Sequence, residues 1–198
     1  MSIPPTRLGD ISEVCLGAPH QDKPSSISIP VRVINVGDFG PDGLKMTSQE
    51  TLQLLPARQK KFEILNHDVL LATKGTIFKT VIFKERKDSV AVLGPNLARI
   101  RMKNSNLAIL LAAAITCDQS SLSIKFHNRR RVRAGGFIGK EDIEEFLFRI
   151  PDDIALDELI TLVKGAQEES EILTTIMSNR RKIVDDLIYQ LMLKQACL

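Results

Sequence analysis

The chain has 198 residues, 43% of them hydrophobic and 26% charged, which are the proportions of an ordinary globular protein. Its 27 basic and 24 acidic side chains leave a formal net charge of +3, too small by itself to indicate a nucleic-acid-binding protein. The longest apolar run, Leu107–Ile115, is much shorter than the ~18–20 residues that cross a membrane, so it predicts a buried helix and excludes a membrane span there.

The first three quarters of the sequence predict a mixed domain of short strands and helices. Alternating β-branched residues predict strands, and clusters of Gly, Pro and polar residues predict the loops between them. The predicted strands are 29–36, 69–73, 77–84, 89–93 and 97–102. A helix is predicted at 106–117 from its Ala and Leu content, and a short helix and strand within 140–149. Two segments stay open: 47–55 is a short helix or irregular, and 120–126 is a strand or a helix end.

From Leu156 onward the pattern changes, because this part of the chain has no proline and a single glycine, Gly165. Apolar residues recur at alternating steps of four and three, the heptad pattern of a helix that pairs with another long helix. A helix folded onto its own domain is the alternative, but a seam of about 30 residues spans about 45 Å, more than such a domain needs. The seam consists of Leu159, Val163, Ala166, Ser170, Leu173, Met177, Arg180, Val184, Leu187 and Leu191.

Residues that usually carry catalysis or metal binding are few and scattered. Three cysteines (Cys15, Cys117 and Cys197) lie far apart, and the three histidines are isolated. This spacing builds neither a disulfide framework nor a zinc site, and the start of the chain lacks the apolar stretch of a signal peptide. We therefore predict a cytoplasmic, non-catalytic protein with no metal and no cofactor of its own.

One pattern leaves an enzymatic alternative open. Asp68 is followed later by Glu85 and, two residues on, by Lys87. On neighbouring strands, such an Asp and Glu-x-Lys can hold magnesium and position water for phosphodiester cleavage. The alternative function is thus a magnesium-dependent nuclease, although a solvated turn over 85–88 would explain the same residues.

The charge is distributed unevenly. Residues 1–153 carry 22 basic and 17 acidic side chains, a net of +5, whereas residues 154–198 carry 5 and 7, a net of −2. The densest positive stretch is 125–133, with five cations and no acid. Guanidinium groups bind phosphate oxygens bidentately and release counterions, so this stretch predicts contact with duplex DNA. A solvated basic loop, in a protein-interaction adaptor that does not bind DNA, is the alternative.

The residues expected at the DNA are mainly cations for the phosphates, joined by one amide that can bond adenine. They are Lys74, Lys79, Lys125, Asn128, Arg129, Arg130, Arg131 and Arg133. Further basic groups stand at 58–61, Lys84, Arg99 and Arg101, and Gln119 is a second candidate amide. The chain has few aromatic residues, which argues against a platform that stacks single-stranded bases.

The order of several short motifs resembles the specificity (S) subunits of type I restriction-modification systems. Segment 7–14 resembles the start of that family's recognition domain, and 65–75 resembles its Gly-Asp-Ile-Leu-Leu strand with a basic-Gly pair. Segments 30–36 and 96–101 resemble further strands, and Gly135, Gly136, Ile143 and Ile150-Pro151 resemble the closing segment. Leu156-Asp157-Glu158 stands where the family opens its spacer helix, although Leu159 replaces the usual Gln and Asn66-His67 the usual Gly.

The resemblance covers nearly the whole chain, but it corresponds to one recognition domain and one helix, about half of a usual S subunit. It implies a subunit that reads one half of a split duplex-DNA target and docks methyltransferase subunits. S-Adenosylmethionine is then expected only in that partner, and a restriction subunit would join for cleavage. Because a second recognition domain is missing, we expect a homodimer, or else a natural or engineered fragment.

The combined prediction is an α+β protein with two parts. Residues 1–153 form a mixed α/β target-recognition domain of short strands, and residues 154–198 form a long C-terminal coiled-coil-like helix for spacing and dimerisation. The residues expected to contact the partner helix are Leu173, Met177, Val184, Leu187 and Leu191.

Overall fold

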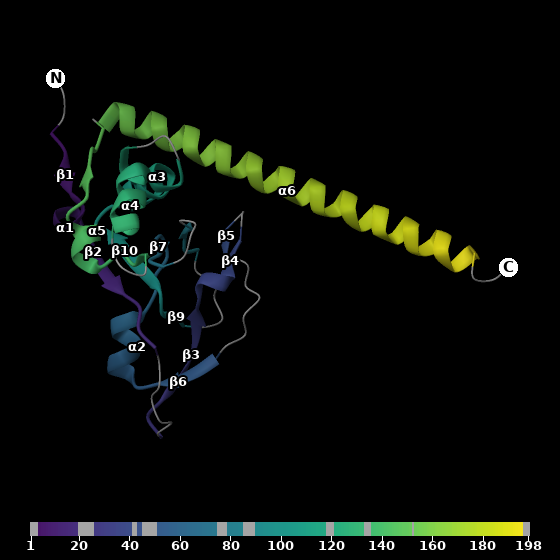
Figure 1. Ribbon diagram of the computed structural model, residues 1–198, viewed down its shortest axis with the longest axis horizontal. Coiled ribbons are helices and arrows are strands. Elements are labelled where there is room, and N and C mark those ends of the chain that lie inside the picture. Colours follow the sequence, from purple (N-terminus) through teal and green to yellow (C-terminus); the bar gives the residue numbers. More distant parts are fainter. Residues whose placement is uncertain are drawn as a thin grey trace. The chain divides into compact units, whose positions relative to one another are not determined.

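The computed structural model describes residues 4–19, 26–40, 43–44, 51–74, 79–84, 90–117, 121–132, 136–151 and 153–195. The predicted mixed α/β domain of short strands with a long C-terminal helix is confirmed (Figure 1). The chain divides into two compact units between Ile160 and Thr161. This division lies seven residues beyond the predicted domain boundary at 153, because the first turns of the last helix bury Leu156 and Ile160 in the first unit.

A four-stranded antiparallel sheet forms the centre of the first unit. Its strands, in spatial order, are β2 (Ser12–Leu16), β10 (Leu97–Met102), β7 (Val69–Ala72) and β8 (Thr80–Ile82). Strand β10 pairs with β2 on one side and with β7 on the other. All four residues of β7 are buried, which explains why this strand has a continuous apolar sequence.

A second sheet of three strands shares its core with the first. It contains β6 (Thr51–Leu54), β3 (Ile29–Ile34) and β9 (Ala91–Leu93), with β3 antiparallel to β6 and parallel to β9. Val33 and Val92 from this sheet join Leu70 and Leu97 from the first in one buried apolar cluster. Two small pairs complete the strands: β1 (Thr6–Arg7) with β11 (Leu147–Phe148), and β4 (Phe39–Gly40) with β5 (Gly43–Leu44).

The helices of the first unit are mostly short. They are α1 (Leu8–Ile11), the 3-10 turn η1 (Val36–Asp38), α2 (Pro56–Phe62), α3 (Ser105–Thr116), α4 (Ser121–Val132) and α5 (Lys140–Glu144). Helix α3 begins after Asn104, whose side-chain oxygen accepts a hydrogen bond from the Asn106 N–H at 2.8 Å. Leu111 and Ile115 of this helix are almost fully buried, which confirms the buried helix predicted at 107–115.

Three local predictions are changed by the structure. For segment 47–55 the sequence left a short helix or an irregular structure open. Residues 51–54 instead form strand β6, whose backbone pairs with that of β3. In 120–126, the described residues belong to α4, so the strand alternative was wrong. Helix α2 was missed, since seven residues are too few to show a periodic pattern.

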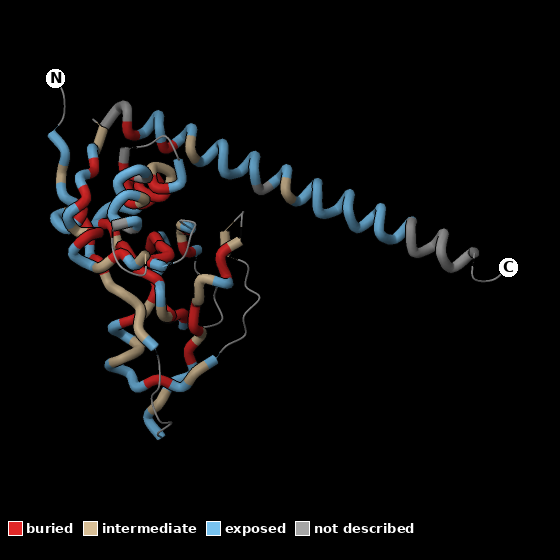
Figure 2. Tube along the Cα trace, viewed as in Figure 1, coloured by how far each residue is buried: buried red, intermediate tan, exposed pale blue. Residues whose placement is uncertain are grey.

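The last helix, α6 (Asp153–Gln195), has 43 residues. Figure 2 shows that buried positions gather in the strands and α3, whereas the described side chains of α6 beyond Ile160 are mostly exposed. Over the residues that the structure describes, none of the helices is long and apolar enough to span a membrane.

Candidate nucleic-acid interface

Helix α4 holds most of the predicted DNA-binding residues, and its inner face determines how they are presented. Leu122 and Phe126, one turn apart, are buried with 4% and 0% of their surfaces exposed. The ring of Phe126 packs on that of Phe146, with their centroids 3.9 Å apart. These contacts fix the rotation of the helix about its axis, because the two apolar side chains occupy one face.

By its spacing along the helix, Arg131 lies opposite this buried face, whereas Lys125 and Arg129 leave the helix beside it. Lys125, Asn128, Arg129 and Arg131 are all exposed. The backbone of Arg130 is part of α4, but its side chain lies outside the described residues, as do all of Arg133 and Gln119. The cationic stretch is thus helical as far as Val132 and is not the basic loop of the alternative interpretation.

An acidic residue lies beside one of these arginines. The Nη2 atom of Arg129 is 3.2 Å from a carboxylate oxygen of Glu145, and both side chains are 52% exposed. An exposed pair of this kind is worth about 0–1 kcal/mol and is weakened by salt. Arg129 is therefore held loosely toward Glu145, and a phosphate group can compete for it.

The predicted lysines stand where β7 ends and where β8 is about to begin. Lys74 is exposed and follows Thr73, whose carbonyl accepts a hydrogen bond from the Ile138 N–H at 3.0 Å. Lys79 is also exposed, and its Nζ atom lies 3.5 Å from the carbonyl oxygen of Phe39. The Thr73–Ile138 bond places Lys74 beside the segment that holds Ile138, and no contact between these lysines and the cations of α4 is seen among the described residues.

Two further cations of the sequence, Arg99 and Arg101, form ion pairs within the first unit. Arg99 is only 2% exposed; its guanidinium donates to the Glu63 carbonyl and to Glu13, each at 2.5 Å. Arg101 donates two hydrogen bonds to Asp68, from Nε at 2.8 Å and Nη2 at 2.7 Å. Both guanidinium groups are thus paired with carboxylates of the protein itself.

This ionic cluster shifts the pKa of one of its members. The hydrogen bond from Arg101 to Asp68 raises the pKa of the Arg101 guanidinium, against the opposite effect of burial, and Glu13 and Glu63 add to the increase. Sequence reasoning missed the cluster, although one signal was present. Arg99 and Arg101 are two residues apart in β10 and therefore lie on the same face of the strand. Arg101 also stands directly opposite Glu13 of β2.

The same cluster bears on the nuclease alternative. Asp68 is 1% exposed, and its oxygens accept the two Arg101 bonds and one from the Leu65 N–H at 2.7 Å. A carboxylate with these partners is a structural counter-ion and is not oriented toward a metal in solvent. Glu85 and Lys87, the other members of the predicted nuclease pattern, lie outside the described residues. The described part of the chain has no group of three His, Cys, Asp or Glu side chains suited to a metal ion.

The second unit exposes the predicted seam. Leu173, Met177, Val184 and Leu187 are 53%, 71%, 52% and 58% exposed. Leu191 lies within α6, but its side chain is outside the described part. Isolated helices of this kind rarely leave such a row of large apolar side chains in water, so the row indicates an interaction surface.

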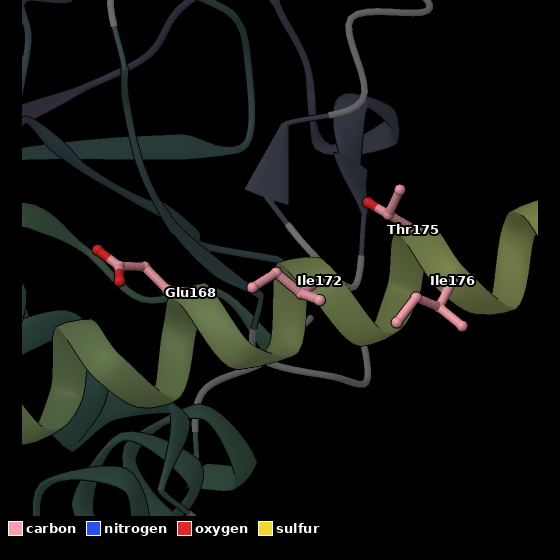
Figure 3. Close-up of a pocket in the computed structure, with 4 residues that line it drawn as sticks. All are labelled: Glu168, Ile172, Thr175 and Ile176. Atoms are coloured by element: carbon pink, nitrogen blue, oxygen red, sulfur yellow. The ribbon is translucent and has the colours of Figure 1, made fainter.

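A shallow hollow lies beside the seam. It is lined by Glu168, Ile172, Thr175 and Ile176, which Figure 3 shows on successive turns of α6. None of these four is a seam residue, and Ile172 and Ile176 are 60% and 45% exposed. The apolar surface of α6 is therefore wider than the two-position seam of a simple helix pair.

Comparison with solved structures gives similar folds. A chain from a type I restriction-modification system, solved in a study of its complex assembly and conformational transition, matches with a TM-score of 0.57. It is 16% identical, and the match covers 85% of this chain and 39% of that one. The crystal structure of the HsdS subunit from Thermoanaerobacter tengcongensis matches with a TM-score of 0.55 and 15% identity, over 86% of this chain and 38% of that one.

These matches establish the fold. At such identities they show the fold alone, and the chain spans about two fifths of the length of these structures. No family model matches the sequence, and no curated protein matches it.

Proposed function

We propose that this protein is the DNA-recognition subunit of a complex of the type I restriction-modification kind, and that it reads one half of a split duplex target. The observation that carries the proposal is the fold, which is similar to the HsdS structure over 86% of the chain. The exposed cations of α4 add a surface suited to a polyanion, independently of that similarity.

In this proposal most of the predicted residues contact phosphates. Lys125 and Arg129 project from α4, and Lys74 and Lys79 flank the connection between β7 and β8. Each neutralised phosphate releases counterions, so binding weakens steeply with salt. The duplex is the preferred form of DNA, because the chain has few aromatic residues for stacking single-stranded bases, and the two on and beside α4, Phe126 and Phe146, are buried against each other.

The protein itself performs no chemistry in this proposal. It docks methyltransferase subunits, which would hold S-adenosylmethionine, and a restriction subunit can join the same complex in the cytoplasm. The engagement of Asp68 with Arg101 supports a non-catalytic role, since it occupies one of the two carboxylates on which the nuclease alternative rests.

The seam of α6 then serves a second copy of the chain. Residues equally distant from Thr175 have matching character: Leu173 with Met177, and Ala166 with Val184. The two polar seam residues, Ser170 and Arg180, are also equally distant from Thr175. An antiparallel pair centred on Thr175 therefore keeps apolar layers together and collects its polar residues in their own layers.

Charges along the helix favour the same direction. Glu168 and Glu169 lie on one side of Thr175, and Arg181 and Lys182 lie at the same distances on the other. Antiparallel pairing brings these acidic and basic turns to the same level, whereas parallel pairing would bring like charges together. We therefore propose an antiparallel homodimer.

The test of the DNA-binding proposal is a salt series. The wild type and a variant with Arg129, Arg130 and Arg131 all changed to Ala are titrated with random-sequence duplex DNA from low to physiological salt. The wild type should bind with a steep negative slope of log K against log salt, and the variant should bind more weakly with a slope smaller by about 2–3.

A control variant removes the same number of positive charges at positions away from the proposed DNA interface. Lys103, Lys140 and Arg149, which are exposed and lie outside both α6 and the predicted DNA-binding set, supply it when changed together to Ala. If the wild type fails to bind any duplex, a protein-interaction adaptor is the better interpretation. If the α4 variant binds with an unchanged slope, the DNA site lies elsewhere.

A further inference from the structure

The outer face of α4 has a composition that phosphate binding does not explain. Ile124, Asn128 and Arg131 follow one another at steps of four and three, so they share one face of the helix. Ile124 is 49% exposed in the middle of a strongly basic segment. An apolar side chain and an amide contribute little to the attraction of phosphate groups, so this face calls for another kind of ligand.

The flank of the helix has the opposite composition. Lys125 and Arg129, one turn apart, lie between the outer face and the buried face formed by Leu122 and Phe126. Both flank residues are cations, and Arg129 is within 3.2 Å of Glu145. The helix thus separates a purely cationic flank from a mixed apolar, amide and cationic face.

The dimensions of α4 suit a groove of duplex DNA. The major groove is about 12 Å wide and admits an α-helix, and a 12-residue helix is about 18 Å long. From Ile124 to Arg131 the rise is about 10 Å, which is about three base-pair steps of 3.4 Å. No acidic residue occurs anywhere in the helix, so nothing in it repels the phosphate walls of the groove.

The three side chains also have the chemistry of base recognition. The amide of an asparagine bonds adenine N6 and N7, a guanidinium bonds guanine O6 and N7, and an aliphatic group contacts the methyl group of thymine. The buried face holds the helix rigid, since Phe126 is fully buried against Phe146. A rigid support is what precise base contacts require.

We propose that α4 is the base-reading helix of this protein, with Ile124, Asn128 and Arg131 facing base-pair edges in the major groove and Lys125 and Arg129 holding the adjacent phosphates. This inference rests on the proposed DNA-recognition function and assigns its specificity to three named residues.

The experiment is selection of bound sequences from a random duplex pool. It compares the wild type with Ile124→Ala, Asn128→Ala, Arg131→Ala and, as the matched control on the flank, Arg129→Ala. Each outer-face variant should lose its preference at one base pair by about 5- to 150-fold, because one good base contact has that value. The control should bind all sequences more weakly and keep the same preferred sequence. Thermal midpoints should stay unchanged, since all four side chains are exposed.

A second arm tests the thymine contact at the level of one methyl group. In the selected sequence, each thymine is replaced in turn by uracil, which lacks that methyl. The wild type should lose affinity at one such position, and Ile124→Ala should not distinguish the two bases there. A residue with a purely structural role would not produce this paired result.

The outcomes separate the inference from the function on which it rests. If the wild type enriches no sequence, the proposed recognition function fails. If the wild type enriches a sequence and the three outer-face variants enrich the same one with unchanged preferences, the function stands and the assignment to α4 is overturned.

Discussion

At the scale of single residues, the environment decides what an arginine does. Arg99 and Arg129 have the same guanidinium group, but one is 2% exposed beside Glu13 and the other is half exposed on α4. A buried charge must be paired, because leaving it alone in a medium of low dielectric constant is costly. The buried arginine therefore contributes to folding, and the exposed one is available for a ligand.

The pair of Asp68 and Arg101 gives a direct prediction of stability. Changing Asp68 to Ala leaves Arg101 without its carboxylate partner and the Leu65 N–H without its acceptor. We expect a loss of about 3 kcal/mol in the free energy of unfolding, measured with urea. Lys140→Ala is the control, since its pair with Glu144 is exposed and should change stability by less than about 1 kcal/mol. Equal stability of the two variants would contradict a structural role for Asp68.

The pH dependence of this pair follows from the sign of the shift. The hydrogen bond to Asp68 raises the pKa of the Arg101 guanidinium above its ordinary value. A group with a raised pKa stabilises the fold fully below the unfolded value and loses that effect only as the pH rises through the folded value. The charge on Arg101 should therefore cause no change in the free energy of unfolding between about pH 6 and pH 9, because this interval lies far below the pKa of an arginine.

Two glycines differ in how closely other atoms approach them. A Cβ atom on Gly94 would lie 2.4 Å from the Asn35 side-chain oxygen and 2.5 Å from the Ile34 carbonyl oxygen. Gly94→Ala should therefore lower stability by about 2–3 kcal/mol, since a backbone atom must move. Gly165→Ala, in the open part of α6, meets nothing within 4 Å and should stabilise the helix by about 0.5–1 kcal/mol. The thermal midpoint should fall for Gly94→Ala and rise for Gly165→Ala. An unchanged midpoint for Gly94→Ala would contradict the close approach of these atoms to Gly94.

At the scale of elements, α4 and α6 are both helices with one exposed functional side, but they differ in what that side contains. Helix α4 buries Leu122 and Phe126 and exposes mainly polar and basic groups. Helix α6 exposes large apolar residues over its described length beyond Ile160. An exposed polar face suits a hydrated polyanion, whereas an exposed apolar face gains free energy only when another apolar surface covers it.

The proposed direction of helix pairing can be tested by cross-linking. In a background without the native cysteines, Ser170→Cys and Arg180→Cys chains are prepared separately and then mixed under oxidising conditions. The antiparallel pair centred on Thr175 predicts a disulfide between the two different chains, and little of either chain with itself. Ser170→Cys dimers formed by that variant alone would indicate parallel pairing instead.

At the scale of the whole molecule, a homodimer with two-fold symmetry requires a DNA target with the same symmetry. A closed antiparallel homodimer has one two-fold axis, so its two recognition domains are related by that axis. The DNA read by such a dimer is an inverted repeat with a fixed gap, because each half-site must present the same bases to an identical domain.

The corresponding prediction is that sequences selected by the wild type are inverted repeats. Leu187→Asp places a charge in the apolar seam and should yield a monomer by light scattering, which then selects a single half-site with lower affinity. Asp186→Asn, on the neighbouring position outside the seam, should remain a dimer and select the full repeat. A wild type that stays monomeric at high concentration would contradict the homodimer, although not docking to a methyltransferase.

The sequence alone determined the long helix, the buried helix α3 and most of the strands, because these depend on periodic patterns over neighbouring residues. It also located the basic stretch that became α4, although not its helical form. Only the tertiary structure decided which charges remain free, since Asp68 and Arg101 meet through strands that are distant in sequence. It likewise decided that Ile124, Asn128 and Arg131 share an outer face, because that face is defined by what Leu122 and Phe126 pack against.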